Sequence, residues 1–281
     1  MRTCQNASLR YSCCLAAFVL ASLFGLASAT AQIPEVRLTA ITPAAGQPGQ
    51  EIEVVIQGTD LDDVNQLQFT HAGITAKPKM REPGAFETEP QVVPNEFVVT
   101  VAGDVPAGHH DVRVVGKYGI SNPRVFVIDA LVTIVEVEGN NQANEAQALE
   151  LPTAVFGQLA QAADVDYFTG QATAGQRIIV RCQARSIDSR MIPVVVVVNS
   201  EGRVLGNSRS TRENEPLVDF ITPADGSFMI KVYDSAYRNG PEYFYRLAVG
   251  NLPHIDYVFP PAGEAGGASL RALLPSCSVS T

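Results

Sequence analysis

The chain contains little cysteine and no tryptophan. Three of its five cysteines precede Ala31, which leaves only Cys182 and Cys277 in the rest of the sequence. A scaffold built on several disulfide bonds is therefore excluded. Helical periodicity is almost absent, apart from residues 143–149, which are long enough for one or two turns. After Ala31 no apolar run is long enough to cross a bilayer, so we expect no membrane span there.

Positive charge is also scarce. Two of the 20 basic residues and none of the 29 acidic residues precede Ala31, so the chain after it carries a net charge of −11. Nucleic acids are bound through basic patches that meet the phosphates, so no nucleic-acid partner is expected. An excess of carboxylates suits divalent cations instead.

Residues 1–31 have the composition of a secretory signal peptide. Arg2 and Arg10 make a basic start, an apolar run follows from Leu15 to Leu26, and small residues end the segment at Ala31. The alternative is a membrane anchor, but the apolar run is short for a bilayer span. We therefore expect the mature protein to be secreted, periplasmic or displayed at the cell surface.

Most of the remaining sequence alternates apolar and polar residues with period two. Clear examples are residues 51–57, 96–101, 111–115 and 124–128, which are separated by Gly, Pro, Asn and Asp. This pattern predicts an all-β sandwich. The valine-rich segment at residues 192–198 does not alternate and predicts a fully buried strand.

Residues 32–131 resemble an immunoglobulin-like IPT/TIG domain. The resemblance rests on a Pro-x-x-Gly corner, a strand that ends in glycine, a Pro-x-Gly turn and a closing Ser-Asn pair. These are Pro43 to Gly46, Gly58, Pro106 to Gly108, and Ser121 with Asn122. Glycine suits such turns because it adopts backbone angles that other residues avoid. The resemblance implies an Ig-like β-sandwich.

Within this first module, residues 77–96 contain four prolines and many charges. We expect a long loop there, which is either a solvated connection or a segment that carries function.

Residues 132–250 resemble the bacterial pre-peptidase C-terminal domain, a jelly-roll-like sandwich related to the collagen-binding modules of secreted collagenases. The motifs that carry the resemblance occur in order at residues 136–141, 151–152, 164–168, 174–176, 223–226 and 243–249. Several strand-like segments fit such a sandwich. The whole chain is therefore predicted to be all-β, with an Ig-like β-sandwich followed by a jelly-roll-like β-sandwich.

A set of acidic and amide side chains is the best candidate for a metal site. It comprises Glu136, Glu138, Asn140, Asn141, Asp164 and Asp166. Calcium prefers oxygen ligands of these kinds. In the collagen-binding relatives the matching segments form a calcium site, so the resemblance implies Ca²⁺ here, although Asn141 stands where an acidic residue is common. The alternative is structural, with aspartates and asparagines that shape turns and glutamates that are solvated.

Four residues near the end of the second module form a candidate binding surface. They are Tyr233, Tyr237, Arg238 and Tyr243. Tyrosine and arginine are favoured contact residues in interfaces. The alternative is packing in the core, since alternation along the last strand turns Tyr245 inward.

Other reactive side chains are expected to be structural. Cys182 shares the apolar face of an alternating segment with Ile178 and Val180, which indicates a buried thiol. His109 and His110 are adjacent on a predicted strand, so their imidazoles point to opposite faces and cannot easily share a metal.

No catalytic motif is recognisable. The sequence lacks a Gly-x-Ser-x-Gly elbow, a His-Glu-x-x-His helix and a phosphate-binding loop. We therefore predict no enzymatic activity. The expected function is that of a secreted binding, adhesion or spacer protein that acts on an extracellular protein or polysaccharide. The alternative is an accessory, pre-peptidase region or a fragment of a larger secreted peptidase or surface protein.

One ten-residue stretch occurs twice. Residues 41–50 align with residues 258–267 at four identical positions, but only the first copy leads into an alternating segment. A lone opening strand cannot bury its apolar face. We therefore expect residues 251–281 to be an incomplete second Ig-like repeat or a disordered tail, in a chain that was once longer.

Overall fold

The computed structural model describes residues 34–84 and 88–254. The predicted signal peptide, the second copy of the ten-residue repeat and Cys277 lie outside these residues. Within the described ranges every regular element is a strand, apart from two 3-10 turns. No helix there is long and apolar enough to span a membrane.

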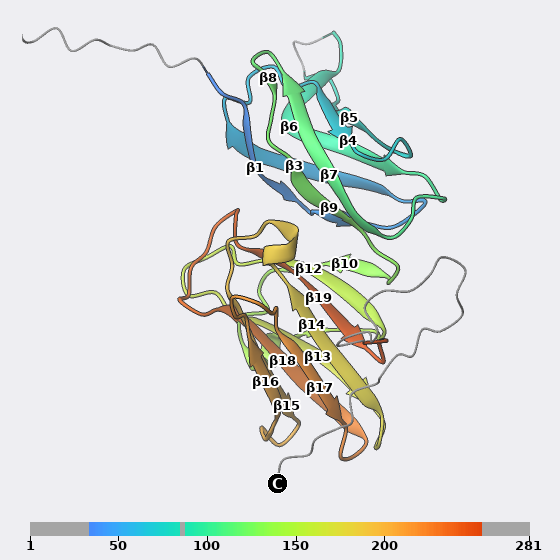
Figure 1. Ribbon diagram of the computed structural model, residues 1–281, viewed down its shortest axis with the longest axis vertical. Coiled ribbons are helices and arrows are strands. Elements are labelled where there is room, and N and C mark those ends of the chain that lie inside the picture. Colours follow the sequence, from blue (N-terminus) through green and yellow to red (C-terminus); the bar gives the residue numbers. More distant parts are fainter. Residues whose placement is uncertain (1–33, 85–87, 255–281) are drawn as a thin grey trace, which may run out of the picture. The chain divides into compact units, whose positions relative to one another are not determined.

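The first nine strands form the two sheets of the first sandwich, drawn from blue to green in Figure 1. Their strands pair antiparallel, except that β2 and β9 are parallel. One sheet has the order β1-β3-β6-β5, and the other has the order β2-β9-β7-β4 with β8 paired to β7. The strands are β1 (Arg37–Thr42), β2 (Ala45–Gly46), β3 (Glu51–Thr59), β4 (Gln66–Phe69), β5 (Ile74–Arg81), β6 (Gln91–Val101), β7 (Gly108–Gly116), β8 (Gly119–Ile120) and β9 (Arg124–Ile128).

The remaining ten strands form two five-stranded sheets, which make up the second sandwich. Their orders are β10-β12-β19-β14-β17 and β11-β13-β18-β15-β16. The strands are β10 (Thr133–Val135), β11 (Gln147–Ala148), β12 (Thr153–Gln158), β13 (Asp166–Ala172), β14 (Arg177–Gln183), β15 (Pro193–Asn199), β16 (Val204–Arg209), β17 (Leu217–Ile221), β18 (Gly226–Asp234) and β19 (Phe244–Gly250), with 3-10 turns η1 (Ala143–Glu145) and η2 (Arg185–Ile187). The predicted all-β sandwich architecture is confirmed.

Period-two alternation produces the predicted faces. In β3, Ile52, Val54 and Ile56 are buried, whereas Glu51, Glu53 and Val55 are exposed. Successive side chains of a strand point to opposite faces, so this single strand supplies both a core face and a solvated face. The last strand agrees with its prediction too, since residues 245, 247 and 249 are all completely buried.

The predicted long loop at residues 77–96 is wrong. Most of the segment belongs to β5 and β6, which pair antiparallel, and only residues 82–90 connect them. Pro78 is tolerated because β5 is the edge strand of its sheet and its ladder is irregular between Pro78 and Met80. The charges are also used, since Lys79 Nζ lies 2.8 Å from a Glu53 oxygen and 3.0 Å from a Glu96 oxygen.

The predicted burial of the valine-rich strand is correct for one face only. Val195 and Val197 of β15 are fully buried, but Val194, Val196 and Val198 are only half-buried. The strand lies in an antiparallel stretch of sheet whose outer face is open, so its second face remains partly exposed. Apolar composition alone does not distinguish a strand covered on both faces from a strand covered on one.

Cys182 lies in the core of the second sandwich, as predicted. It is completely buried on β14, and burial raises the pKa of its thiol well above the usual range. A buried thiol without a nearby activating cation is inert and serves as a small apolar residue.

Candidate functional site

Glu136 lies at the centre of a group of polar side chains at the start of the second sandwich. It directly follows β10, and its backbone N–H donates to the carbonyl of Phe156 at 2.9 Å. Its carboxylate accepts the side-chain N–H of Asn140 at 2.8 Å and the backbone N–H of Gln158 at 2.9 Å. One carboxylate therefore holds the segment after β10 against β12.

Asp166 reaches the same group from β13. Its side chain is completely buried and accepts the Tyr245 hydroxyl at 2.6 Å, while that hydroxyl lies 3.4 Å from a Glu136 oxygen. Gly157 makes this approach possible, because a Cβ there would collide with the Tyr245 ring and lie 2.7 Å from the Glu136 carboxylate. We refer to Glu136, Asn140, Asp166 and Tyr245, together with Asn141, which follows Asn140 in the chain, as the acidic cluster.

Three buried oxygens of the acidic cluster have no hydrogen-bond donor. They are Asn140 Oδ1, Asn141 Oδ1 and Asp166 Oδ1. Across residues 34–84 and 88–254, the Thr42 hydroxyl is the only other buried side-chain polar atom without a partner. A buried acceptor without a donor destabilises the folded state by roughly 1–3 kcal/mol. Buried polar atoms are rarely left without a partner, so these three call for an explanation.

The unpaired atoms are of the chemical kind that hard cations bind. All three are carboxylate or amide oxygens, which are the ligand atoms that calcium prefers. Carboxylates alone do not make the site, because among the described residues no three Asp, Glu, His or Cys side chains converge as a metal-binding group. The asparagine oxygens are therefore essential to any cation site at this place.

The other two predicted ligands have different surroundings. Asp164 is buried, but its carboxylate accepts the backbone N–H groups of Ala160, Gln161 and Val165, so it shapes the turn before β13. Glu138 is exposed, and desolvation together with the charge of Asp164 raises its pKa. Of the six predicted residues, hydrogen bonds join Glu136 to Asn140 and, through Tyr245, to Asp166, and Asn141 follows Asn140 in the chain.

Burial dominates the electrostatics of the acidic cluster. It raises the pKa of Asp166 to about 9, and the adjacent charge of Glu136 adds to the increase. Burial likewise raises the pKa of Glu136, although hydrogen bonds from Asn140 and from the backbone of Gln158 oppose it. Without a cation, at least one of these two carboxyl groups is therefore protonated near neutral pH.

This protonation makes a prediction for the metal-free chain. In the presence of a chelator, the free energy of unfolding should fall as the pH rises from about 4 to about 9. The folded state binds a proton at Asp166 that the unfolded chain has already released, so unfolding releases a proton and higher pH favours it. The contribution reaches at most about 1.4 kcal/mol per pH unit.

Urea titrations at several pH values measure this slope. Asp166→Asn should flatten it, because the amide carries no titrating proton. A slope that is identical in the wild type and in Asp166→Asn would assign the effect to other groups.

Sequence reasoning missed the polar role of Tyr245. It placed the ring correctly in the core but took no account of the hydroxyl, which joins Asp166 to Glu136. A signal was present, since a tyrosine rather than a phenylalanine at an inward position requires a buried partner for its hydroxyl.

The predicted tyrosines lie on and beside the outer face of the β11-β13-β18-β15-β16 sheet. Tyr233 and Tyr237 stack with ring centroids 5.4 Å apart and an interplanar angle of 14°. Lys231 Nζ lies 5.0 Å from the ring centroid of Tyr233 and 5.8 Å from that of Tyr167. Tyr237 is 49% exposed, so these rings are accessible to a partner.

Strand register extends this surface across the sheet. Val194 of β15 lies opposite Tyr233, and Val196 lies opposite Lys231, which in turn lies opposite Tyr167. Directly opposed residues point to the same side of a sheet. We refer to Tyr167, Val194, Val196, Lys231, Tyr233 and Tyr237 as the tyrosine face.

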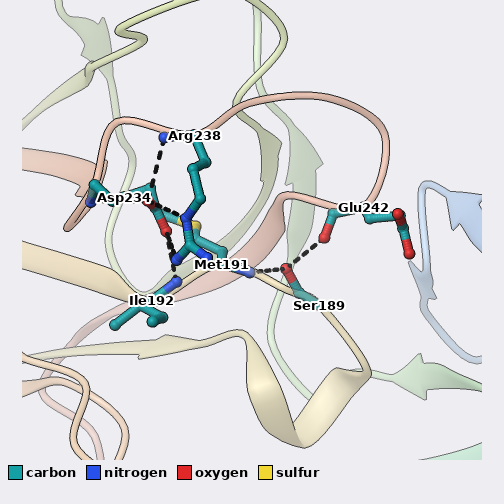
Figure 2. A network of polar contacts seen from close by, with 7 residues as sticks. Ser189, Met191, Ile192, Asp234, Arg238 and Glu242 are labelled. Atoms are coloured by element: carbon teal, nitrogen blue, oxygen red, sulfur yellow. Dashed lines mark hydrogen bonds and ion pairs between the residues drawn. The ribbon is translucent and has the colours of Figure 1, made fainter.

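Arg238 and Tyr243 are engaged in contacts within the chain. Figure 2 shows the Arg238 guanidinium paired with Asp234, at 2.9 Å for both Nε and Nη2. The same guanidinium lies 5.4 Å from the ring centroid of Tyr243, which packs against the core. Their role in ligand binding stays a prediction, whereas their structural role is visible.

Asp234 organises this region (Figure 2). It is completely buried and accepts the backbone N–H groups of Ile192 at 2.8 Å and Ala236 at 2.9 Å, besides the guanidinium of Arg238. Burial alone would raise the pKa of Asp234, but the hydrogen bonds from Arg238 and the backbone more than offset it and lower the pKa. The ionised carboxylate therefore fixes the turn that carries Tyr237.

No protein-family model matches this chain, and neither does any curated protein. Among solved structures, the pre-peptidase C-terminal domain of a collagenase from Bacillus anthracis is 20% identical, with 39% of this chain and 99% of that chain covered and a TM-score of 0.32. The periplasmic lysozyme inhibitor PliG of Aeromonas hydrophila is also 20% identical, with 42% and 93% covered and a TM-score of 0.27. The secreted serine protease VesC of Vibrio cholerae is 10% identical, with 82% and 52% covered and a TM-score of 0.28. These likenesses are too slight to assign a function to the chain.

Proposed function

We propose that this chain is a non-catalytic binding protein of the extracellular or periplasmic space, and that its tyrosine face holds an extracellular protein or polysaccharide. The observation that carries the proposal is the stacked, accessible pair of Tyr233 and Tyr237 with Lys231 beside it. Together with the half-exposed valines of β15, these rings form an apolar surface with a single cation among them.

Covering the tyrosine face with a partner removes apolar surface from water. Aromatic rings bury a large area at low cost in conformational entropy, because they have few rotatable bonds. Tyr233 and Tyr237 are already held against one another, so little further order is lost when a partner binds. An exposed apolar group of this kind on a soluble domain often marks an interaction site.

We also propose that the acidic cluster binds calcium. Glu136, Asn140, Asn141 and Asp166 would hold the ion, and Glu138 and Asp164 would add negative charge at its margin. A bound divalent cation would satisfy the three unpaired oxygens and stabilise the ionised form of Asp166. The ion would then order residues 136–141 and not take part in any reaction.

Alanine replacement of the stacked tyrosines tests the binding proposal. The double variant Tyr233→Ala/Tyr237→Ala should weaken binding to the partner at least tenfold, because interface tyrosines commonly contribute about 2 kcal/mol or more each, that is, about thirtyfold. Binding is measured by biolayer interferometry against panels of extracellular matrix proteins and polysaccharides, with calcium and with chelator.

Tyr118→Ala is the matched control. Tyr118 is also exposed and also has a lysine over its ring, with Lys117 Nζ at 5.6 Å, but it belongs to the first sandwich. Equal loss in both variants, or no binding to any member of the panels, would contradict the proposal.

A further inference from the structure

A cleft lined by arginines opens at one end of β15 and β16. It has a volume of about 450 Å³ and lies where the segment after η2, the segment after β16 and Ser235 meet. Ten of the described residues line it; four of these ten are arginines and none of the ten is acidic. The arginines are Arg185, Arg190, Arg209 and Arg212. We refer to this feature as the arginine cleft.

Two of these guanidinium groups are not committed to other contacts. Arg209 and Arg212 are exposed and form no ion pair or side-chain hydrogen bond in the part of the chain that the structure describes. Arg190 is paired with Glu242 at 3.1 Å. Arg185 donates to the backbone carbonyls of Thr211 and Arg212, so its charge is held in place but is not neutralised by a carboxylate.

Positive charge is concentrated at the arginine cleft although the chain as a whole is acidic. The chain has 29 acidic and only 20 basic residues, yet four of the basic residues surround this one cleft. Like charges that share a site repel one another, and a bound anion removes that repulsion. The arrangement is therefore explained most directly by an anionic ligand.

The floor of the arginine cleft is rigid, as a preformed site requires. Ser189 Oγ accepts the N–H groups of Met191 at 3.2 Å and Phe244 at 3.1 Å, and donates to the carbonyl of Glu242 at 3.1 Å (Figure 2). The rim is fixed too, since the Ser210 N–H donates to the carbonyl of Pro193 at 2.8 Å. Little reorganisation is needed for ligand binding.

The arginine cleft is continuous with the tyrosine face. Arg209 lies opposite Val194, and Val194 lies opposite Tyr233, so the three side chains form one row on the outer side of the sheet. Arg209 and Tyr233 are on strands separated by β15, so their Cα atoms are about 10 Å apart, twice the distance between neighbouring strands. A short oligosaccharide spans that distance.

We propose that the arginine cleft binds the carboxylate or sulfate groups of an acidic polysaccharide, whose chain continues across the tyrosine face. This inference rests on the binding function proposed above and specifies its ligand. Arginine forks bind carboxylate and sulfate oxygens through paired hydrogen bonds. The rings of Tyr233 and Tyr237 suit the C–H faces of sugar rings.

A polysaccharide is favoured over an acidic peptide by the rest of the lining. Ser210, Thr211 and Ser235 place hydroxyl groups beside the arginines, where they suit sugar hydroxyls. The stacked rings of Tyr233 and Tyr237 lie on and beside a sheet face and are not in the described lining of the cleft, so they form no pocket for an apolar peptide side chain. A peptide ligand remains one outcome of the test.

The test compares four polymers bound to the full chain. Polygalacturonate supplies carboxylates on sugar, heparin supplies sulfates on sugar, dextran is neutral, and poly-L-glutamate supplies carboxylates on a peptide. At least one acidic polysaccharide should bind, and dextran should not. Arg209→Ala/Arg212→Ala should weaken the binding about tenfold or more. Salt should weaken it as well, since about 0.5 M salt screens charges far more strongly than about 0.05 M.

Arg203→Ala is the matched control, because Arg203 is exposed at the opposite end of β16 and lies outside the lining of the cleft. It should change binding by less than about twofold. The inference is overturned if no acidic polysaccharide binds, if Arg203→Ala matches the double variant, or if poly-L-glutamate binds as tightly as the polysaccharides.

The variants also separate this inference from the proposed function. If Tyr233→Ala/Tyr237→Ala abolishes binding to some partner and Arg209→Ala/Arg212→Ala does not, the tyrosine face is a binding surface and the acidic ligand is wrong. If only the arginine variant loses binding, the arginine cleft acts alone and the proposed role of the tyrosine face fails.

Discussion

Calcium is expected to raise the melting temperature of the second sandwich by about 5–10 °C over its value in chelator. A ligand present at about 100 times its dissociation constant stabilises the folded state by about 2.7 kcal/mol, and each kcal/mol shifts the melting temperature of a domain of this size by several degrees. The proposed ion would satisfy Asn140 Oδ1, Asn141 Oδ1 and Asp166 Oδ1, which have no donor among the described residues, and this accounts for the expected stabilisation. Differential scanning calorimetry at millimolar calcium and in excess chelator measures the shift.

Two substitutions locate the effect. Asp166→Asn and Glu136→Gln should each abolish most of the calcium-dependent shift, because a hard divalent cation depends on the charge of its ligands. Glu145→Gln removes the same charge from an exposed position in η1 and should leave the shift unchanged. A melting temperature that does not respond to calcium in the wild type, or responds equally in all three variants, would exclude the site.

Asp234→Ala is expected to destabilise the second sandwich by about 2–3 kcal/mol. The substitution leaves the partly buried N–H groups of Ile192 and Ala236 without their acceptor and removes the partner of Arg238. A carboxylate that accepts several hydrogen bonds cannot be replaced by the small alanine side chain, so these donors lose their charged acceptor. Urea denaturation, followed by circular dichroism, measures the change.

Asp219→Ala is the matched control for this result. Asp219 pairs with Arg177, but both side chains are about one third exposed, at 27% and 35%. Exposed ion pairs contribute about 0–1 kcal/mol, so this variant should remain close to the wild type. If Asp234→Ala also costs less than about 1 kcal/mol, the network in Figure 2 does not hold the turn as described.

The fold class was predictable because strand periodicity is a local property. The alternation of buried Ile52, Val54 and Ile56 with exposed residues requires only that one face of the strand be covered. The prediction from local composition was wrong where the same residues are compatible with either a loop or an edge strand. Pro78 and Met80 belong to an edge strand rather than a loop, and only the pairing with β6 shows it.

The acidic cluster was predictable in part. Glu136 and Asp166 were identified as candidate ligands by residue type, but nothing in the sequence shows that Tyr245 joins them or that Gly157 leaves room for the contact. Asp164 has the same residue type as Asp166 and a different use, because the backbone N–H groups of its own turn already surround it. The identity of a side chain does not reveal which donors reach it.

The sequence by itself determined the all-β class, the burial of Cys182 and the acidic character of the segment that precedes η1. Each depends on residue type and on spacing along one strand. Only the tertiary structure decided which oxygens lack a partner, which side of β15 is open and that four arginines share one cleft. Arg185 and Arg190 lie on one side of β15 in the sequence, and Arg209 and Arg212 lie on the other. Their charges meet because the connection after η2 and the end of β16 come together in the folded sheet.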